Sequence, residues 1–263
     1  MELHYFWLPF LGFVIGLLAT MVGGNGAFFF PPALILLFQV SPRVAIATSL
    51  AAVIPIGLIG SIEHYRRGNI NLPIGTVFGL FGLTGAFAGA WLSSILEVNT
   101  LVLTFGIYAI LLGLFTLRIP KRNTAKMRKP PERFADLNRR NLPLISAIGL
   151  VSGFVAGLYG TSGTAPVLAA LLLLQLPFKI IIGTSVMIVF INAFSGFIGH
   201  LLVGEFDLQL IFLLGSGAAV GAFLGPRLLS RIRHEQRRET KFRYVLSALL
   251  IIMGAFLVMR FMW

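Results

Sequence analysis

Long runs without a charged residue divide the chain. With Asp, Glu, Lys and Arg as interruptions, eight long runs stand out: 3–42, 44–62, 68–96, 98–117, 141–178, 180–204, 208–226 and 244–259. A helix needs about 20 apolar residues to cross a bilayer, so six runs predict single spans. The runs 3–42 and 141–178 are roughly twice as long as one span requires, so each can hold a helical hairpin. The pattern predicts an all-α polytopic membrane protein.

Composition and charge exclude several other classes. Only 11% of the 263 residues are charged, whereas soluble domains carry about 25%. Of the 21 Lys and Arg, 16 lie in 118–143 and 227–243, the pattern typical of cytoplasmic loops, so we expect lipid and not nucleic acid as the surrounding partner. The absence of cysteine excludes thiol catalysis and Cys-based metal sites. We expect no cofactor and no metal.

An internal repeat pairs distinctive residues of the two halves. When the chain is aligned with itself so that Gln39 falls on Gln175, His64 falls on His200. Near the start of each half the register differs by one position. Further pairs are Arg43 with Lys179, Thr48-Ser49 with Thr184-Ser185, Gly85 with Gly221, Tyr108 with Tyr244, Gly16 with Gly153, and Gly26 with Gly163.

Equivalent loops of the two halves carry opposite charge. Arg66 and Arg67 correspond to a loop with Glu205 and Asp207, and the loop with Glu97 corresponds to the basic segment 227–243. Because basic loops stay in the cytoplasm, equivalent loops are expected on opposite sides of the membrane. The sequence therefore predicts two inverted-topology repeats, each a broken hairpin followed by three helices, the architecture of many carriers that work by alternating access.

The repeat fixes the predicted domain boundaries, with both termini extracytoplasmic. The first repeat covers 1–119, a basic cytoplasmic linker covers 120–141, and the second repeat covers 142–263. The first repeat holds a hairpin at 5–39 and spans at 43–63, 72–96 and 98–118; the second holds a hairpin at 143–176 and spans at 179–200, 208–228 and 243–261.

A glycine cluster interrupts each predicted hairpin, at 23–26 and at 160–163, and Pro31, Pro32 and Pro166 follow. Glycine costs about 1 kcal/mol in a helix interior and proline about 3 kcal/mol, so both helices should stop there. The helix that restarts points unpaired N–H groups at the gap, where positive partial charge attracts anions. The predicted anion cradle comprises Gly24, Asn25, Gly26, Gly160, Thr161, Ser162, Gly163 and Thr164. The alternative is a packing turn whose hydroxyls cap the helix.

Further polar residues of the spans are candidates for the same site. Thr48-Ser49 and Thr184-Ser185 lie early in the span after each hairpin. They either face the cavity or bond their own helix backbone four residues back. Asn192 lies in mid-span, and its equivalent in the first half is the apolar Ile56. Asn192 is either a substrate ligand or part of an interhelical hydrogen bond.

Charged and titratable candidates lie at the span ends. Arg43 and Lys179 are candidates for gathering or gating anions, or they extend to lipid headgroups. His64 and His200 have the side chain suited to proton-linked transport, with interfacial anchoring as the alternative. Since no Asp or Glu lies deep in a predicted span, carboxylate-driven coupling is not visible; protons remain a candidate coupling ion.

Two rival functions fit parts of the pattern. Gly160 to Gly163 match the G-x-S-G pattern of intramembrane serine proteases, with Ser162 as nucleophile and His200 as base. Asn25 stands at the equivalent place in the first half and is no nucleophile, so a shared glycine turn explains the motif better. An anion channel with a hairpin filter is the stronger alternative.

The glycine pattern carries a family resemblance. G-x-x-A-x-x-x-G-x-x-G runs from Gly16 to Gly26 and again from Gly153 to Gly163, each followed by Pro and then by Thr-Ser in the next span. This resembles the TauE/SafE family of sulfite and organosulfonate exporters over nearly the whole chain. The resemblance implies a carrier for a small sulfur-containing anion in a bacterial or archaeal inner membrane. The predicted function is accordingly a secondary transporter and not an enzyme.

Overall fold

The computed structural model describes residues 3–21, 25–118, 141–174, 176–203, 206–231 and 236–262. Every regular element in this part of the chain is a helix, as predicted. The linker as far as residue 140, together with Gly23, Gly24, Gln175 and Glu205, lies outside the described residues.

The described part of the chain forms two short 3-10 helices and ten α-helices. The elements are η1 (Leu3–Trp7), α1 (Leu8–Met21), η2 (Asn25–Phe29), α2 (Phe30–Leu37), α3 (Pro42–Arg66), α4 (Leu72–Ile95), α5 (Val98–Arg118), α6 (Leu142–Tyr159), α7 (Thr164–Leu173), α8 (Phe178–Val203), α9 (Leu208–Arg231) and α10 (Gln236–Met262).

Six of the described helices are long and apolar enough to cross a membrane. Five of them, α3, α4, α5, α8 and α9, are predicted spans. The sixth is α6, the first arm of the second hairpin, so this arm has the length of a full crossing. The apolar part of α10 is shorter, at Ser247–Met262. The chain is a multi-pass helical membrane protein.

Two compact units combine helices from both predicted repeats. The first contains the two hairpins with α3, α4, α8 and most of α9, and the second contains α5 and α10. Each unit therefore draws on residues from before and after the linker, and neither repeat forms a compact body alone.

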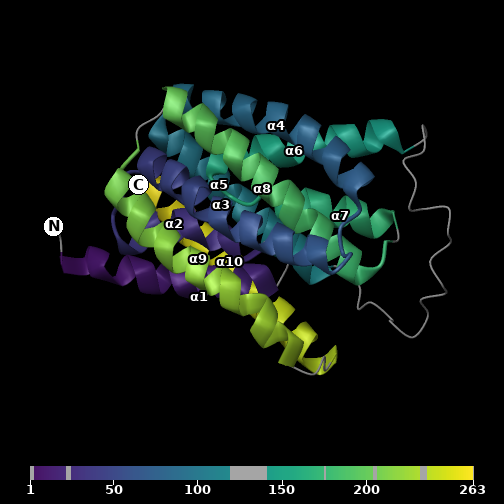
Figure 1. Cartoon of the computed structure of the whole chain (residues 1–263). Coiled ribbons are helices and arrows are strands. Elements are labelled where there is room, and N and C mark those ends of the chain that lie inside the picture. The colour runs from purple at the N-terminus through teal and green to yellow at the C-terminus, as the bar shows by residue number, and fades with distance from the viewer. Residues whose placement is uncertain are drawn as a thin grey trace. The chain divides into compact units, whose positions relative to one another are not determined.

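Small residues line the buried side of α4. Gly82, Gly85 and Gly89 leave no room for a Cβ against the facing backbone of α6 or a buried side chain of α8, and α4 and α6 lie side by side (Figure 1). Leu80, Phe81 and Trp91 on the other side of α4 are exposed. Such an arrangement suits a bilayer, where small residues allow close helix packing and large apolar residues can face lipid.

The same close packing recurs between α9 and α1. Gly85 of α4 approaches the carbonyl of Leu150 in α6, and its counterpart Gly221 of α9 approaches the carbonyl of Phe13 in α1. Both members of each contact are related by the repeat found in the sequence. The second span of each half, α4 or α9, thus packs on the first hairpin arm of the other half.

Helices α3 and α8 are counterparts in the same repeat, and they pack against each other. A Cβ on Gly60 would lie 2.7 Å from a side-chain atom of Val186, and one on Gly196 would lie 3.2 Å from a side-chain atom of Leu50. In the register that pairs Gln39 with Gln175, Gly60 is equivalent to Gly196 and Leu50 to Val186, so the two contacts are equivalent. Since early residues of α3 meet late residues of α8, the two helices run antiparallel.

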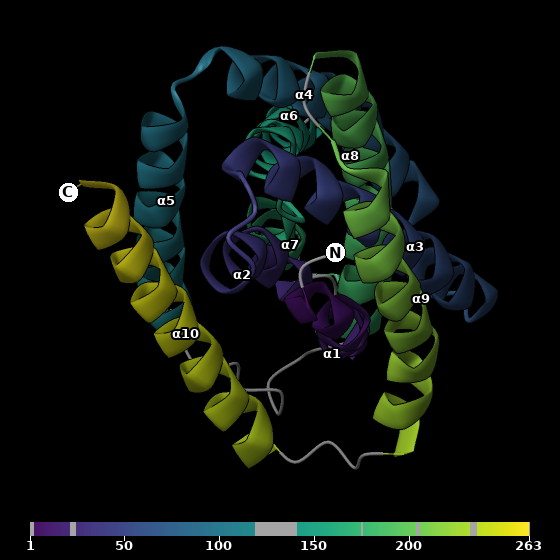
Figure 2. The same cartoon turned by 90° about the vertical axis from the view of Figure 1, so that its left-hand side faces the viewer.

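The second unit is also a pair of counterpart helices. A Cβ on Gly106 of α5 would lie 2.9 Å from the carbonyl oxygen of Gly254 in α10, and one on Gly113 would lie 3.0 Å from that of Ser247. Residue numbers rise along α5 as they fall along α10, so this pair is antiparallel too (Figure 2).

Glycine-to-alanine substitutions test the duplicated packing. Gly85→Ala and Gly221→Ala each press a methyl group against backbone, and we expect each to lower stability by about 1–3 kcal/mol. Gly215→Ala is the control, since nothing lies within 4 Å of that position. Thermal unfolding of the purified protein in lipid nanodiscs measures the effect. A melting temperature of either variant equal to that of Gly215→Ala would contradict the proposed equivalence.

Candidate functional site

The second hairpin breaks where the sequence predicts. Helix α6 ends at Tyr159 because Gly160 adopts a left-handed conformation, with φ of 68°, and its N–H bonds the carbonyl of Ala156 at 2.9 Å. Gly163 is also left-handed, with φ of 56°, and packs against the backbone of Ser152. L-residues with a side chain rarely adopt such angles. Helix α7 then begins at Thr164.

The first hairpin is interrupted at the equivalent place. Helix α1 ends at Met21, a 3-10 helix runs from Asn25 to Phe29, and α2 begins at Phe30 with proline in its first turn. Gly26 packs against α1, where a Cβ would lie 2.6 Å from the backbone nitrogen of Ala19. Gly24 lies outside the described residues, so the structure describes one predicted cradle, at α7, more fully than the other.

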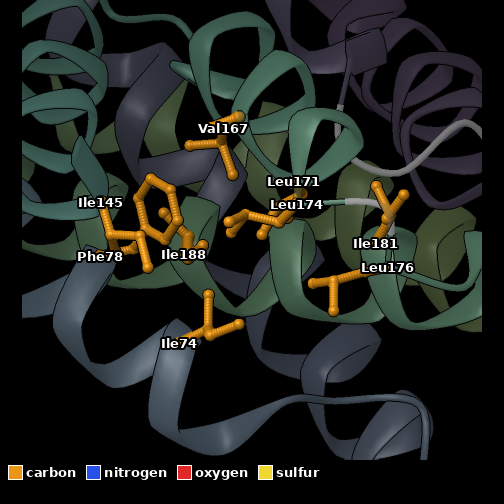
Figure 3. Packing of buried hydrophobic residues seen from close by; sticks show 10 residues of the cluster. Ile74, Phe78, Ile145, Val167, Leu171, Leu174, Leu176, Ile181 and Ile188 are labelled. Atoms are coloured by element: carbon orange, nitrogen blue, oxygen red, sulfur yellow. The ribbon is translucent and has the colours of Figure 1, made fainter. Parts of the chain in front are cut away.

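Apolar packing holds α7 in place inside the first unit. Val167 and Leu171 of α7 belong to one buried cluster with Phe78 of α4, Ile145 of α6 and Ile188 of α8 (Figure 3). The half-helix is therefore enclosed by three longer helices. Its N-terminal end adjoins the middle of α8, because the turn before it connects to Asn192, a central residue of that helix.

A buried chain of hydrogen bonds joins Asn192 to the turn. The Asn192 side-chain N–H donates to Ser152 Oγ at 3.0 Å, and the Ser152 hydroxyl donates to the Gly163 carbonyl at 2.7 Å. Asn192 and Ser152 are fully buried. Asn192 therefore makes an interhelical hydrogen bond, one of its two predicted alternatives. Sequence reasoning missed Ser152, although Ile15 at the equivalent place in the first half marks it as a polar exception.

Two threonine hydroxyls, one in the turn and one in α3, are buried without a hydrogen-bond partner among the described residues. Thr161 Oγ1 and Thr48 Oγ1 both have none among the described residues, and the two side chains are at most 1% exposed. The turn adjoins this part of α3, since a Cβ on Gly160 would lie 2.7 Å from the Cα of Ile46. Ser162 and Thr164 are buried as well. Buried polar groups are ordinarily satisfied, so the Thr48 and Thr161 hydroxyls are exceptions among the described residues.

The other predicted hydroxyls are already engaged. Ser49 donates to the Ala45 carbonyl at 2.6 Å and Ser185 donates to the Ile181 carbonyl at 2.7 Å. This is bonding to the own helix four residues back, the alternative given for these residues. Thr184 Oγ1 accepts the backbone N–H of Asn71 at 3.0 Å, at the start of α4. Thr184 and its counterpart Thr48 thus differ in their contacts.

His200 is tied to the end of α6. Its Nε2 lies 2.8 Å from the Gly157 carbonyl oxygen, and the side chain is 1% exposed. The imidazole N–H therefore satisfies a carbonyl of the last turn of α6, where intrahelical partners run out. No hydrogen bond between Ser162 and His200 occurs among the described residues. The contact that a Ser–His dyad needs is thus not present in this arrangement.

The remaining candidates lie toward the helix ends. Arg43 is half-buried in the first turn of α3, while Lys179 is exposed at the start of α8. His64 is half-buried, and its Nδ1 has no hydrogen-bond partner among the described residues. Within the same residues, no group of three or more His, Asp or Glu side chains is placed to hold a metal ion.

These features define a class: a polytopic helical membrane protein with two interrupted hairpins, one of which ends in a buried polar turn beside the middle of a spanning helix. The model of the sulfite exporter TauE/SafE family matches residues 8–257. The chain belongs to that family.

Similar proteins from other organisms are named as probable membrane transporters. The chain is 28% identical to the probable membrane transporter protein YunE of Bacillus subtilis over 95% of this chain and 96% of the relative. It is 30% identical to the probable membrane transporter protein YdhB of the same organism, over 82% and 86% of the two chains. A probable membrane transporter protein of Methanocaldococcus jannaschii is 23% identical over 96% and 94%. No solved structure matches. The protein is a membrane transporter.

Histidine substitutions test the assignment of His200 to the end of α6. His200→Phe leaves the Gly157 carbonyl buried without its donor, which should cost about 1–3 kcal/mol. His64→Phe is the matched control at the equivalent position, because His64 Nδ1 makes no hydrogen bond to the described residues that the substitution could remove. We expect a lower melting temperature in nanodiscs for His200→Phe than for His64→Phe. Equal melting temperatures would remove the structural role assigned to His200.

Proposed function

We propose that this transporter carries a small sulfur-containing oxyanion, such as sulfite or an organosulfonate, out of the cell. The anion binds at the start of α7, beside the turn Gly160–Gly163. Gly24, Asn25 and Gly26 form the corresponding part of the first hairpin. Family membership supports the substrate class, and the chemistry of the turn supports an anion in particular.

The N-terminal end of α7 supplies hydrogen-bond donors suited to an anion. The first N–H groups of a helix have no partner within the helix, and the helix dipole adds positive partial charge there. The buried Thr161 hydroxyl, which has no partner among the described residues and lies just before Thr164 at the start of α7, is the single observation that carries the proposal. A hydroxyl donates readily to an oxyanion, and Thr48 on the adjacent helix α3 is in the same state.

The remaining parts of the mechanism follow from the repeat. Two antiparallel counterpart helices at the centre of the first unit support alternating access, in which one half moves against the other. The basic loops then lie in the cytoplasm of a bacterial or archaeal cell, and both termini lie outside the inner membrane. Arg43 and Lys179 gather anions at the two mouths, and His64 with its equivalent His200 provides the proton-linked groups.

Hydroxyl substitutions test the placement of the site. Thr161→Val and Thr48→Val keep the size of the side chain but remove the donor, so the KM for sulfite should rise about tenfold or more for each. Ser49→Ala and Ser185→Ala are the controls, because these hydroxyls already bond their own helices, and their KM should stay within about twofold. Uptake of radiolabelled sulfite into proteoliposomes gives these values.

The same vesicles test the substrate and the coupling ion. Competitive inhibition by sulfonates and a response to an imposed pH gradient would support the proposed substrate class and proton coupling. Saturable uptake of neither sulfite nor any sulfonate would overturn the substrate assignment. If Thr161→Val and Ser49→Ala had the same KM, the substrate would bind elsewhere in the molecule.

A further inference from the structure

We infer that Asn192 and Ser152 are positioning residues, which aim the first N–H of α7 at the substrate by fixing the Gly163–Thr164 peptide without touching the substrate themselves. The inference rests on the proposed site at α7 and assigns a role to two residues outside the turn.

The donor and the acceptor of each hydrogen bond between Asn192, Ser152 and Gly163 can be assigned. A carbonyl oxygen cannot donate, so the Ser152 hydroxyl hydrogen goes to Gly163 O. Ser152 Oγ must then accept from its other neighbour, and the Asn192 amide nitrogen is the group that faces it at 3.0 Å. The Asn192 amide oxygen is thereby turned to the other side, where it lies against Gly82 of α4. This oxygen has no hydrogen-bond partner among the described residues, so the bond of Asn192 joins α8 to α6.

The bond to Gly163 O orients the donor of the next residue. The peptide unit is planar and trans, so its C=O and N–H point in opposite directions. Because the Gly163 carbonyl points at Ser152 of α6, the N–H of Thr164 points away from α6. Thr164 is the first residue of α7, and its N–H is one of the unpaired groups that the proposed site uses.

Glycine at 163 allows this arrangement. Its φ of 56° is unfavourable for residues with a side chain, and a Cβ would collide with the backbone of Ser152. The turn can therefore approach α6 closely enough for the Ser152 hydroxyl to reach it.

The first half cannot form the same connection. The counterparts of Asn192 and Ser152 are Ile56 and Ile15, both buried and apolar. The two hairpins are therefore unequal: hydrogen bonds fix the turn of the second, while apolar residues occupy the equivalent places in the first. We assign the orienting of the substrate to the second hairpin.

The test uses Asn192→Leu, Ser152→Ala and the double variant in the full chain, reconstituted in nanodiscs and in proteoliposomes. The control is Ser195→Ala, which removes a different, partly buried hydrogen bond between α8 and α4, from Ser195 Oγ to Leu83 O at 2.7 Å. Amide hydrogen exchange of the segment 160–166 reports on the turn without any substrate. Sulfite uptake gives KM and the maximal rate.

We expect faster exchange of this segment in both single variants, by about tenfold, and exchange as in the unsubstituted protein for Ser195→Ala. The KM for sulfite should rise about tenfold, with the maximal rate within about twofold. Since the two residues act in series, the double variant should resemble the single variants.

Two results would overturn the inference. One is unchanged exchange of segment 160–166 in Asn192→Leu and Ser152→Ala; the other is an effect of Ser195→Ala on KM as large as theirs. Failure of the proposed function is a separate result. If the unsubstituted protein does not transport sulfite, the substrate assignment fails, while the exchange measurement still decides whether Asn192 and Ser152 fix the turn.

Discussion

The structure depends on one constraint: backbone groups released from a helix at membrane depth must be enclosed by protein. The turn at Gly160–Gly163 meets it, because α6 is packed on α4, α8 passes beside it and the following half-helix α7 lies in a buried apolar cluster. Close contacts at glycine make this enclosure tight enough. The interrupted hairpin is enclosed by α4 of the other half together with α8 of its own half, which fits a compact unit that cuts across the two repeats.

The duplication holds for several glycine contacts and less well for polar contacts. The contacts of Gly85 and Gly221 are equivalent, and so are the own-helix bonds of Ser49 and Ser185, although Gly79 packs on Ile191 while its equivalent Gly215 has nothing within 4 Å. By contrast, Thr184 accepts a backbone N–H whereas Thr48 has no partner among the described residues, and Asn192 corresponds to Ile56. A protein that alternates between two states needs a common scaffold for its halves, while a single substrate needs only one oriented set of donors. The unequal polar contacts fit that division.

Much of the fold could be predicted from the sequence because it follows from local signals. Uncharged runs predicted the helices, and glycine clusters predicted both breaks. The partners of individual side chains could not be predicted in this way. Asn71 bonds Thr184 across 113 positions and Ser152 bonds Asn192 across 40, and nothing local to these residues indicates such contacts. For the same reason, sequence periodicity does not predict that each compact unit combines helices from both repeats.

We propose that the two interrupted hairpins belong to a carrier that binds a sulfur oxyanion and changes the side to which it is open. Counterflow tests it most directly. Proteoliposomes loaded with unlabelled sulfite are diluted into a trace of labelled sulfite, with no ion gradient. A carrier of this kind gives a transient accumulation of label above its equilibrium level, which vesicles loaded with chloride do not show. Label that only equilibrates, at a rate that does not saturate with sulfite, would contradict the account and indicate a channel.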